Sequence, residues 1–118
     1  MGTRFIPTHE SQADPAYKQM IVDCNAEDLM VTASITGTAA SWLKPSMRNA
    51  GLDPDQMPDT PTRSYDSNQS FAGKRWMDVW AAGQGLGAIK QIEPVAQVVD
   101  RLVVEYQQAA KRFAALAR

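Results

Sequence analysis

Cysteine and histidine are almost absent from this sequence of 118 residues, which contains one of each, Cys24 and His9. A single cysteine cannot form a disulfide within the chain, and this favours a reducing compartment, so we expect a cytoplasmic protein. Zinc sites need several cysteine or histidine ligands at short spacings, which this composition does not offer. The acidic residues between 52 and 66 lack the alternating ligands and central glycine of an EF-hand loop. The sequence therefore predicts no metal site.

An excess of charge and long hydrophobic runs are missing as well. The net charge is −1, so nothing favours binding to nucleic acid or to an anionic membrane surface. No apolar run approaches the roughly 18 residues that a membrane-spanning helix requires, and the first residues lack the pattern of a signal peptide. We therefore expect neither a nucleic-acid partner nor a membrane partner. With 44% hydrophobic and 21% charged residues, the chain has the composition of one ordinary globular domain.

Neither His9 nor Cys24 lies in a pattern that is typical of catalysis. His9 stands in a polar turn, THES, and Cys24 lies on the apolar face of an expected helix, where free cysteines usually pack in a core. A nucleophilic thiol needs a base and an electropositive setting, and neither is visible here. We predict no catalytic residue.

Short elements separated by breaks are expected before residue 83. Pro45 argues against one continuous helix in the middle of the chain. The three tryptophans, Trp42, Trp76 and Trp80, are expected in the core rather than stacked on a ligand. The expected elements are a β-type run in MGTRFIP ended by Pro7, a helix over Pro15–Cys24 capped by Thr8 or Asp14, a strand in DLMVTASIT, a short helix within Ser41–Ala50 ended by Gly51, a long loop over 52–70 and a helix over Lys74–Ala82.

The last segment carries the clearest pattern of the sequence. Pro94 suits a first helical turn, and apolar residues then recur every three or four positions, which predicts an amphipathic helix over Pro94–Ala115. A long apolar helix face is normally covered by another protein surface, so we expect a homo-oligomer formed through this face. The residues expected at this contact are Val95, Val99, Leu102, Tyr106 and Phe113.

The stretch Trp80–Lys90, WAAGQGLGAIK, has three glycines within five residues. It is not a P-loop, because no Gly-Lys-Ser/Thr follows, and it is not a dinucleotide fingerprint, because no strand precedes it. One reading is structural: the end of a helix, a tight turn and the next helix. The other reading is that the backbone must come close to a ligand.

Taken in order, the segments MGTRF, WLKPSMRNAGLDPD, WMDVWAAGQGLG and PVAQVVDRLVVEY resemble the C-terminal part of nitronate monooxygenases, also called 2-nitropropane dioxygenases. The resemblance covers essentially the whole chain, and MGTRF and WAAGQGLG are its most specific parts. It implies an FMN-dependent flavoprotein with a TIM barrel, of which this mainly helical α/β chain would be the C-terminal fragment. Residues 1–6 would be the last barrel strand, 8–90 a small accessory domain and 93–117 the terminal helix.

The same resemblance implies which residues face the cofactor. Gly2 and Thr3 would offer backbone donors to the FMN phosphate, and Gly83, Gln84 and Gly85 would form one wall beside the flavin. A TIM barrel takes roughly 250 residues, so most of the barrel and the catalytic histidine of the family are missing, and His9 does not stand at the matching place.

Three interpretations follow. The chain is a fragment or remnant of an enzyme that oxidises alkyl nitronates, inactive alone. Alternatively, it is a stand-alone interaction or ligand-binding domain derived from the accessory domain. In the third interpretation it is a subunit whose site is completed by a separate barrel-forming chain.

Overall fold

The computed structural model describes residues 1–57 and 78–117. Its elements are α1 (Gly2–Phe5), α2 (Pro15–Asp23), the 3₁₀ helix η1 (Ala26–Asp28), β1 (Leu29–Thr32), β2 (Ala40–Leu43), α3 (Lys44–Asn49), the 3₁₀ helices η2 (Pro54–Gln56) and η3 (Gln84–Ala88), and α5 (Val95–Leu116). This is the mainly helical α/β chain that the sequence predicts. Most of the expected loop over 52–70, together with Trp76, lies outside the described residues.

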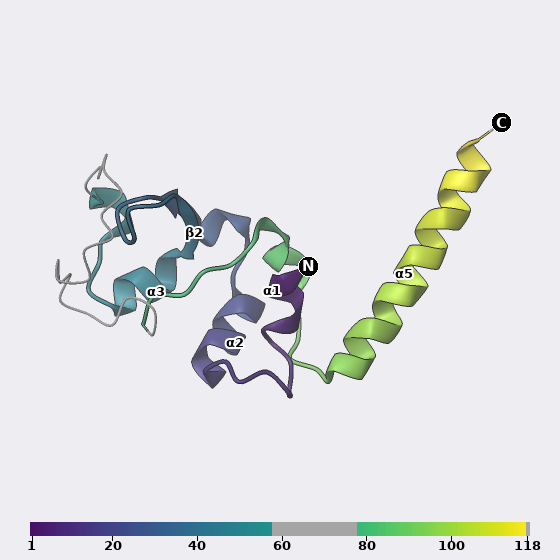
Figure 1. The fold of residues 1–118 in the computed structure, drawn as a ribbon, viewed down its shortest axis with the longest axis horizontal. Helices are drawn as coiled ribbons and strands as arrows, with labels where there is room; N and C mark the ends of the chain where they lie inside the picture. Colours follow the sequence, from purple (N-terminus) through teal and green to yellow (C-terminus); the bar gives the residue numbers. More distant parts are fainter. Residues whose placement is uncertain (58–77, 118) are drawn as a thin grey trace.

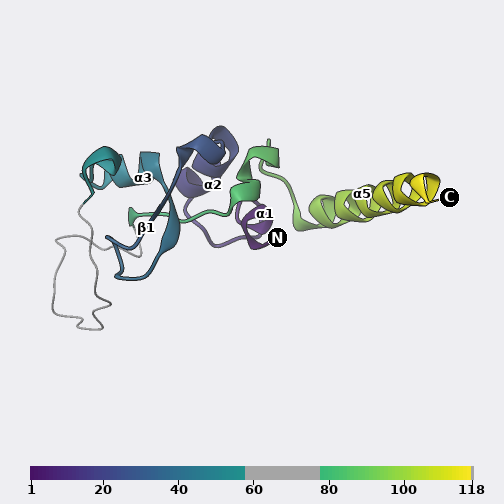
Figure 2. The same ribbon diagram turned by 90° about the horizontal axis from the view of Figure 1, so that it is seen from above.

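The molecule has two unequal parts. A body made of α1, α2, α3, the 3₁₀ helices and the sheet continues into α5, which projects away from it (Figures 1 and 2). The molecule is consequently elongated, with extents of 56 × 34 × 24 Å. The N-terminus lies in the body, close to η3 (Figure 1).

The sheet of the described residues has two antiparallel strands, β1 and β2, with Leu29 opposite Leu43 and Thr32 opposite Ala40. The other edge of β2 is partly covered by the segment before the glycines. The N–H of Leu43 donates to the Trp80 carbonyl at 2.8 Å, and the N–H of Ala82 donates to the Ser41 carbonyl at 3.2 Å. The expected helix over Lys74–Ala82 is therefore wrong at its C-terminal end, because this backbone pairs with a strand instead of with itself.

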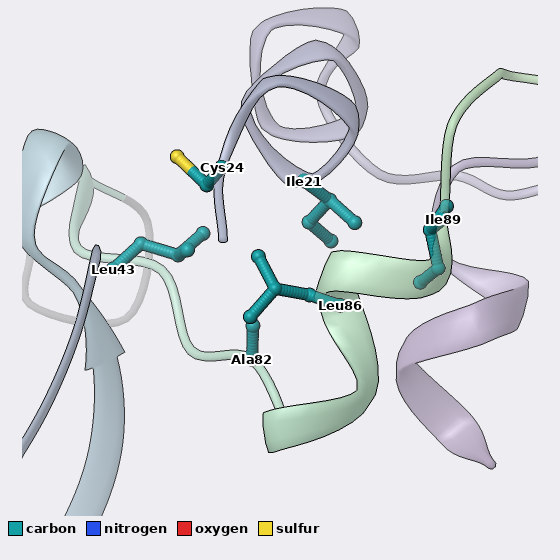
Figure 3. Close-up of a cluster of buried hydrophobic side chains, with 6 residues drawn as sticks. All are labelled: Ile21, Cys24, Leu43, Ala82, Leu86 and Ile89. Carbon is teal, nitrogen blue, oxygen red and sulfur yellow. The ribbon is translucent and has the colours of Figure 1, made fainter. Parts of the chain in front are cut away.

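The described residues form two hydrophobic clusters, and β2 contributes to both, Leu43 to the first and Trp42 to the second. The first joins α2, β2 and η3 through the buried residues Ile21, Cys24, Leu43, Ala82, Leu86 and Ile89 (Figure 3). The second contains Ile35, Trp42, Met47 and Val79. Trp42 is buried as predicted, whereas Trp80 is only half-buried and packs against the first cluster.

The helix α2 confirms the sequence prediction almost to the residue. Pro15 occupies the first turn, where its missing N–H costs nothing. The Asp14 carboxylate caps the helix by accepting from the Ala16 N–H at 2.7 Å. Ile21 on its inner face is fully buried.

The short helix predicted within Ser41–Ala50 begins later in the structure than its earliest predicted residue. Residues Ala40–Leu43 form β2, and the short helix α3 begins only at Lys44, so Pro45 opens this helix rather than interrupting it. Gly51 ends the segment as predicted. Its φ of 82° is in the left-handed region that favours glycine.

The expected strand at residues 1–6 is wrong, because Gly2–Phe5 forms the short helix α1. A strand needs a neighbour to accept its backbone hydrogen bonds. Here the N–H of Arg4 instead donates to the carbonyl of Met1 at 3.0 Å. The backbone thus satisfies itself locally.

The long terminal helix is confirmed as α5, with Pro94 immediately before it. Only its first turns contact the body: Val98 is 1% exposed, whereas Tyr106 and Phe113 are 75% and 76% exposed. Within residues 1–57 and 78–117, most of the apolar face that the sequence predicts is therefore uncovered.

Candidate functional site: the junction of α1 and the glycine segment

The structure brings together the two most specific motifs of the sequence, MGTRF and WAAGQGLG. The backbone N–H of Gly83 donates to the Thr3 Oγ1 at 2.9 Å, across 80 positions of the chain. A Cβ at residue 83 would stand only 3.1 Å from the same oxygen. Glycine at this position therefore allows the two segments to approach closely.

The residues 83–87, GQGLG, are called the glycine segment. Burial of the Leu86 side chain holds this segment in place. This side chain is fully buried and lies in the first cluster, between α2 and β2 (Figure 3). Gly83, Gln84 and Gly85 on the other side of the turn are exposed. The segment forms η3, so it begins a 3₁₀ helix instead of ending the helix that we expected before it.

Of the remaining predicted site residues, Gly2 and Gly85 have open space where a side chain would stand, with nothing within 4 Å of a Cβ placed on either. A ligand can therefore approach the backbone at both. Gly2, Thr3 and the glycine segment offer backbone N–H groups and one hydroxyl, which are donors of the kind that bind a phosphate.

Behind this junction, a buried carboxylate that no sequence pattern singled out connects α1 with α5. Glu93 is 2% exposed, and its Oε1 lies 2.6 Å from Nη2 of Arg4 on α1. Its Oε2 lies 2.7 Å from Nη2 of Arg101 on α5 and accepts from Gln91 Nε2 at 3.0 Å. One carboxylate thus ties the N-terminal helix to the terminal helix.

The charge state of Glu93 follows from these neighbours. Burial raises the pKa of the Glu93 carboxyl, but hydrogen bonds from Gln91, Arg101 and Arg4 and the charge of Arg101 outweigh it and hold the pKa below its usual value. Glu93 is therefore ionised near neutral pH. The only sequence signal was a glutamate before Pro94 with an arginine two helical turns later.

The backbone around Glu93 is fixed as well. The N–H of His9 donates to the Glu93 carbonyl at 3.2 Å, and the Glu10 carboxylate accepts from the Val95 N–H at 2.9 Å. Glu10 thereby caps α5, and this hydrogen bond is the main cause that lowers the pKa of its carboxyl. The body therefore determines the direction in which α5 leaves.

Two other side chains with reactive potential, those of Cys24 and Tyr17, take part in packing and hydrogen bonding. Burial raises the pKa of the Cys24 thiol, to which Asp28 and Asp23 also contribute, so the unreactive protonated form is favoured. The Tyr17 hydroxyl donates to the Ala81 carbonyl, and its ring stacks on Trp80 with centroids 5.1 Å apart. The His9 side chain is exposed, as predicted.

In residues 1–57 and 78–117 no group of three or more His, Cys, Asp or Glu side chains could hold a metal ion.

None of the helices in the described part of the chain is long and apolar enough to cross a membrane.

No family model matches the sequence. The chain is similar to a probable nitronate monooxygenase from Bacillus subtilis (strain 168), with 27% identity over 115 residues, 89% of this chain and 32% of that protein.

Among solved structures, the fold is similar to FabK from Thermotoga maritima. A point mutant of that protein matches with a TM-score of 0.64 and 23% identity, covering 98% of this chain and 36% of FabK. The unmutated protein matches with a TM-score of 0.62 and 22% identity, covering 98% and 38%. The chain thus spans about a third of the length of these relatives. The sequence comparison agrees with the motifs, which resemble part of a nitronate monooxygenase, and the structural comparison shows a shared fold.

Proposed function

We propose that this chain supplies one wall of an FMN site, formed by Gly2, Thr3, Gly83, Gln84 and Gly85. The observation that carries the proposal is the hydrogen bond between Gly83 and Thr3, which joins the two motifs through which the chain resembles a flavin enzyme. The open space at Gly2 and Gly85 supports it, because a phosphate or a flavin ring can reach the backbone there.

The reaction of such a site, oxidation of an alkyl nitronate, would belong to the completed site. Backbone N–H groups and a threonine hydroxyl bind and orient a cofactor, but they do not act as a general base at neutral pH. A wall formed by two short segments also buries little of the flavin, so we expect weak binding of FMN and no nitronate oxidation by this chain alone. The missing walls would come from another polypeptide or from further sequence.

Weak binding can be located by nuclear magnetic resonance. We expect millimolar FMN to shift the backbone amide signals of Gly2, Thr3 and Gly83–Gly85 in a saturable manner, with little change at α3. Riboflavin, which lacks the phosphate, serves as the comparison and should shift the Gly2 and Thr3 signals less. Absence of saturable shifts, or shifts confined to other residues, would contradict the proposal.

A matched pair of variants sharpens this experiment. Gly85 has no positive φ and open space around it, so Gly85→Val should fold normally while occupying the space that a ligand needs. Gly87→Ala is the control, because its Cβ would make only an ordinary contact, 3.9 Å from Asn25 Oδ1. We expect Gly85→Val to weaken the FMN-dependent shifts and Gly87→Ala to leave them unchanged.

A second function, that of a stand-alone interaction domain, is favoured by one observation, the exposed apolar face of α5.

A further inference from the structure

Beyond the first two turns of α5, no other described residue covers its apolar side chains. All residues at positions 103–117 are exposed, and they include Tyr106 at 75%, Phe113 at 76% and Leu116 at 82%. An apolar stripe of this length is typical of a surface that binds a partner. The body leaves it free, because α5 projects away from the other elements (Figures 1 and 2).

A helical partner fits the spacing of the stripe. Apolar residues recur at alternating intervals of three and four, which is the pattern of a two-helix coiled coil. We call this set the α5 seam: Val99, Leu102, Tyr106, Ala109, Phe113 and Leu116. A second helix that runs along the seam would cover it.

The two sides of the seam differ in charge. One side carries Glu105 and Arg112, each one residue before a seam residue, and both are exposed. The opposite side carries Val103 and Ala110, each one residue after a seam residue. In a parallel pair of copies, the charged side of one helix meets the apolar side of the other, so the charges would face apolar residues. In an antiparallel pair, like sides meet, so Glu105 can face an arginine.

Charge also selects the register of an antiparallel pair. In one register, Glu105 lies opposite Arg112 of the partner subunit, and symmetry produces this ion pair twice. Sliding one helix along the other by one heptad changes these pairs. A shift in one direction places Glu105 opposite the partner's Glu105, and a shift in the other places Arg112 opposite the partner's Arg112. Both shifts replace attraction with repulsion.

The same register also fits the side chains by size. Tyr106 lies opposite Ala109 of the partner subunit, Leu102 opposite the partner's Phe113, and Val99 opposite the partner's Leu116. A bulky residue thus meets a small one at the centre, and apolar residues meet at both ends. We propose that a second copy of this chain covers the seam, and that the two α5 helices form an antiparallel coiled coil in this register. The proposal stands on α5 alone and does not depend on FMN binding.

The experiment is sedimentation analysis of the full chain over a range of concentrations, for the wild type and for charge variants. We expect a dimer for the wild type. Glu105→Arg alone and Arg112→Glu alone should each raise the dissociation constant roughly tenfold or more, since each removes two ion pairs and creates two repulsions. Lys111→Glu, which lies away from the seam, is the control and should leave the dimer unchanged.

Mixing the two single variants provides the decisive test. The antiparallel register predicts a heterodimer of Glu105→Arg with Arg112→Glu that is as stable as the wild-type dimer, because every pair again has opposite charges. The double variant should likewise form a homodimer. Circular dichroism checks that each variant retains its helix.

Three results would overturn the proposal. A wild-type chain that stays monomeric at every concentration would leave the face to a different polypeptide. A dimer that ignores both single charge changes would use another surface. Single variants that fail to recover on mixing would exclude this register.

Discussion

The body and α5 both carry large apolar side chains, but the body buries them and α5 exposes them. In the body, Leu86 and Ile21 are completely buried by segments that are distant in the chain. In α5, Val103, Val104 and Tyr106 are 50%, 49% and 75% exposed. Helical periodicity alone therefore predicts where an apolar face lies, but not what covers it.

The largest expected effect lies in the body. Leu86→Ala should lower the free energy of unfolding by about 3 kcal/mol, because it removes a fully buried side chain and leaves a cavity between α2 and β2. Leu116→Ala is the matched control on α5, where the side chain is 82% exposed, and it should change the value for a monomer by less than about 0.5 kcal/mol. Urea denaturation at low protein concentration measures both. Equal effects would mean that the two parts are not as different as the structure shows.

The second effect concerns the connection between the two parts. Glu93→Gln should cost about 2 kcal/mol, because it removes the charge that Arg4 and Arg101 share and leaves the mostly buried Arg4 without its ion pair. Thermal unfolding at neutral pH measures the loss. Glu105→Gln, which changes an exposed glutamate of α5, is the control and should have little effect on the monomer.

The Glu93 network also predicts a dependence on pH. The pKa of Glu93 is lower in the folded than in the unfolded chain, so its stabilisation is fully present above the ordinary value of 4.5. It is lost as the pH falls below 4.5, through the folded-state pKa. The difference in stability between wild type and Glu93→Gln should therefore shrink in this acidic range. A difference that stays constant from neutral pH to pH 3 would contradict the assignment.

A smaller effect is expected at the end of α3. Gly51→Ala should destabilise the body by about 1 kcal/mol, because φ is 82° and a side chain is strained there even though nothing crowds a Cβ. Gly2→Ala, with the same open space and no positive φ, is the comparison. Similar melting temperatures for the two variants would contradict the conformational explanation.

The smallest effect is expected at Val104→Ala. This residue is 49% exposed and lies away from the α5 seam, so the free energy of unfolding should change by less than about 0.5 kcal/mol and the dimer should be unaffected. Val99→Asp, on the seam, should instead disrupt the dimer while α5 remains helical. Sedimentation and circular dichroism separate the two outcomes.

Sequence reasoning succeeded where the signal is local. Asp14 and Pro15 announce the start of α2, Gly51 announces the end of α3, and the spacing of apolar residues defines α5. It failed where the outcome depends on a distant neighbour. The segment before the glycines looks helical, but its last residues pair with β2. The MGTRF run looks like a strand, but a strand requires a partner that the described chain does not provide, and it forms α1.

The candidate site shows the same limit. The resemblance selected Thr3 and Gly83, and the structure places them in hydrogen-bond contact. No local pattern could show that Glu93 binds Arg4, because 89 positions separate them. A carboxylate that contacts two arginines on different helices becomes visible only when the chain is folded.

The Thr3–Gly83 contact has a consequence for the order in which the molecule forms. It closes a loop that comprises most of the chain, and closing such a loop costs more entropy than forming a local helix. Contacts of high sequence separation slow folding and form late. During synthesis, the contact between Thr3 and Gly83 cannot form until the glycine segment has left the ribosome. We therefore expect α2 and α5 to gain helical structure early, and the junction that would meet a cofactor to be among the last parts of the molecule to assemble.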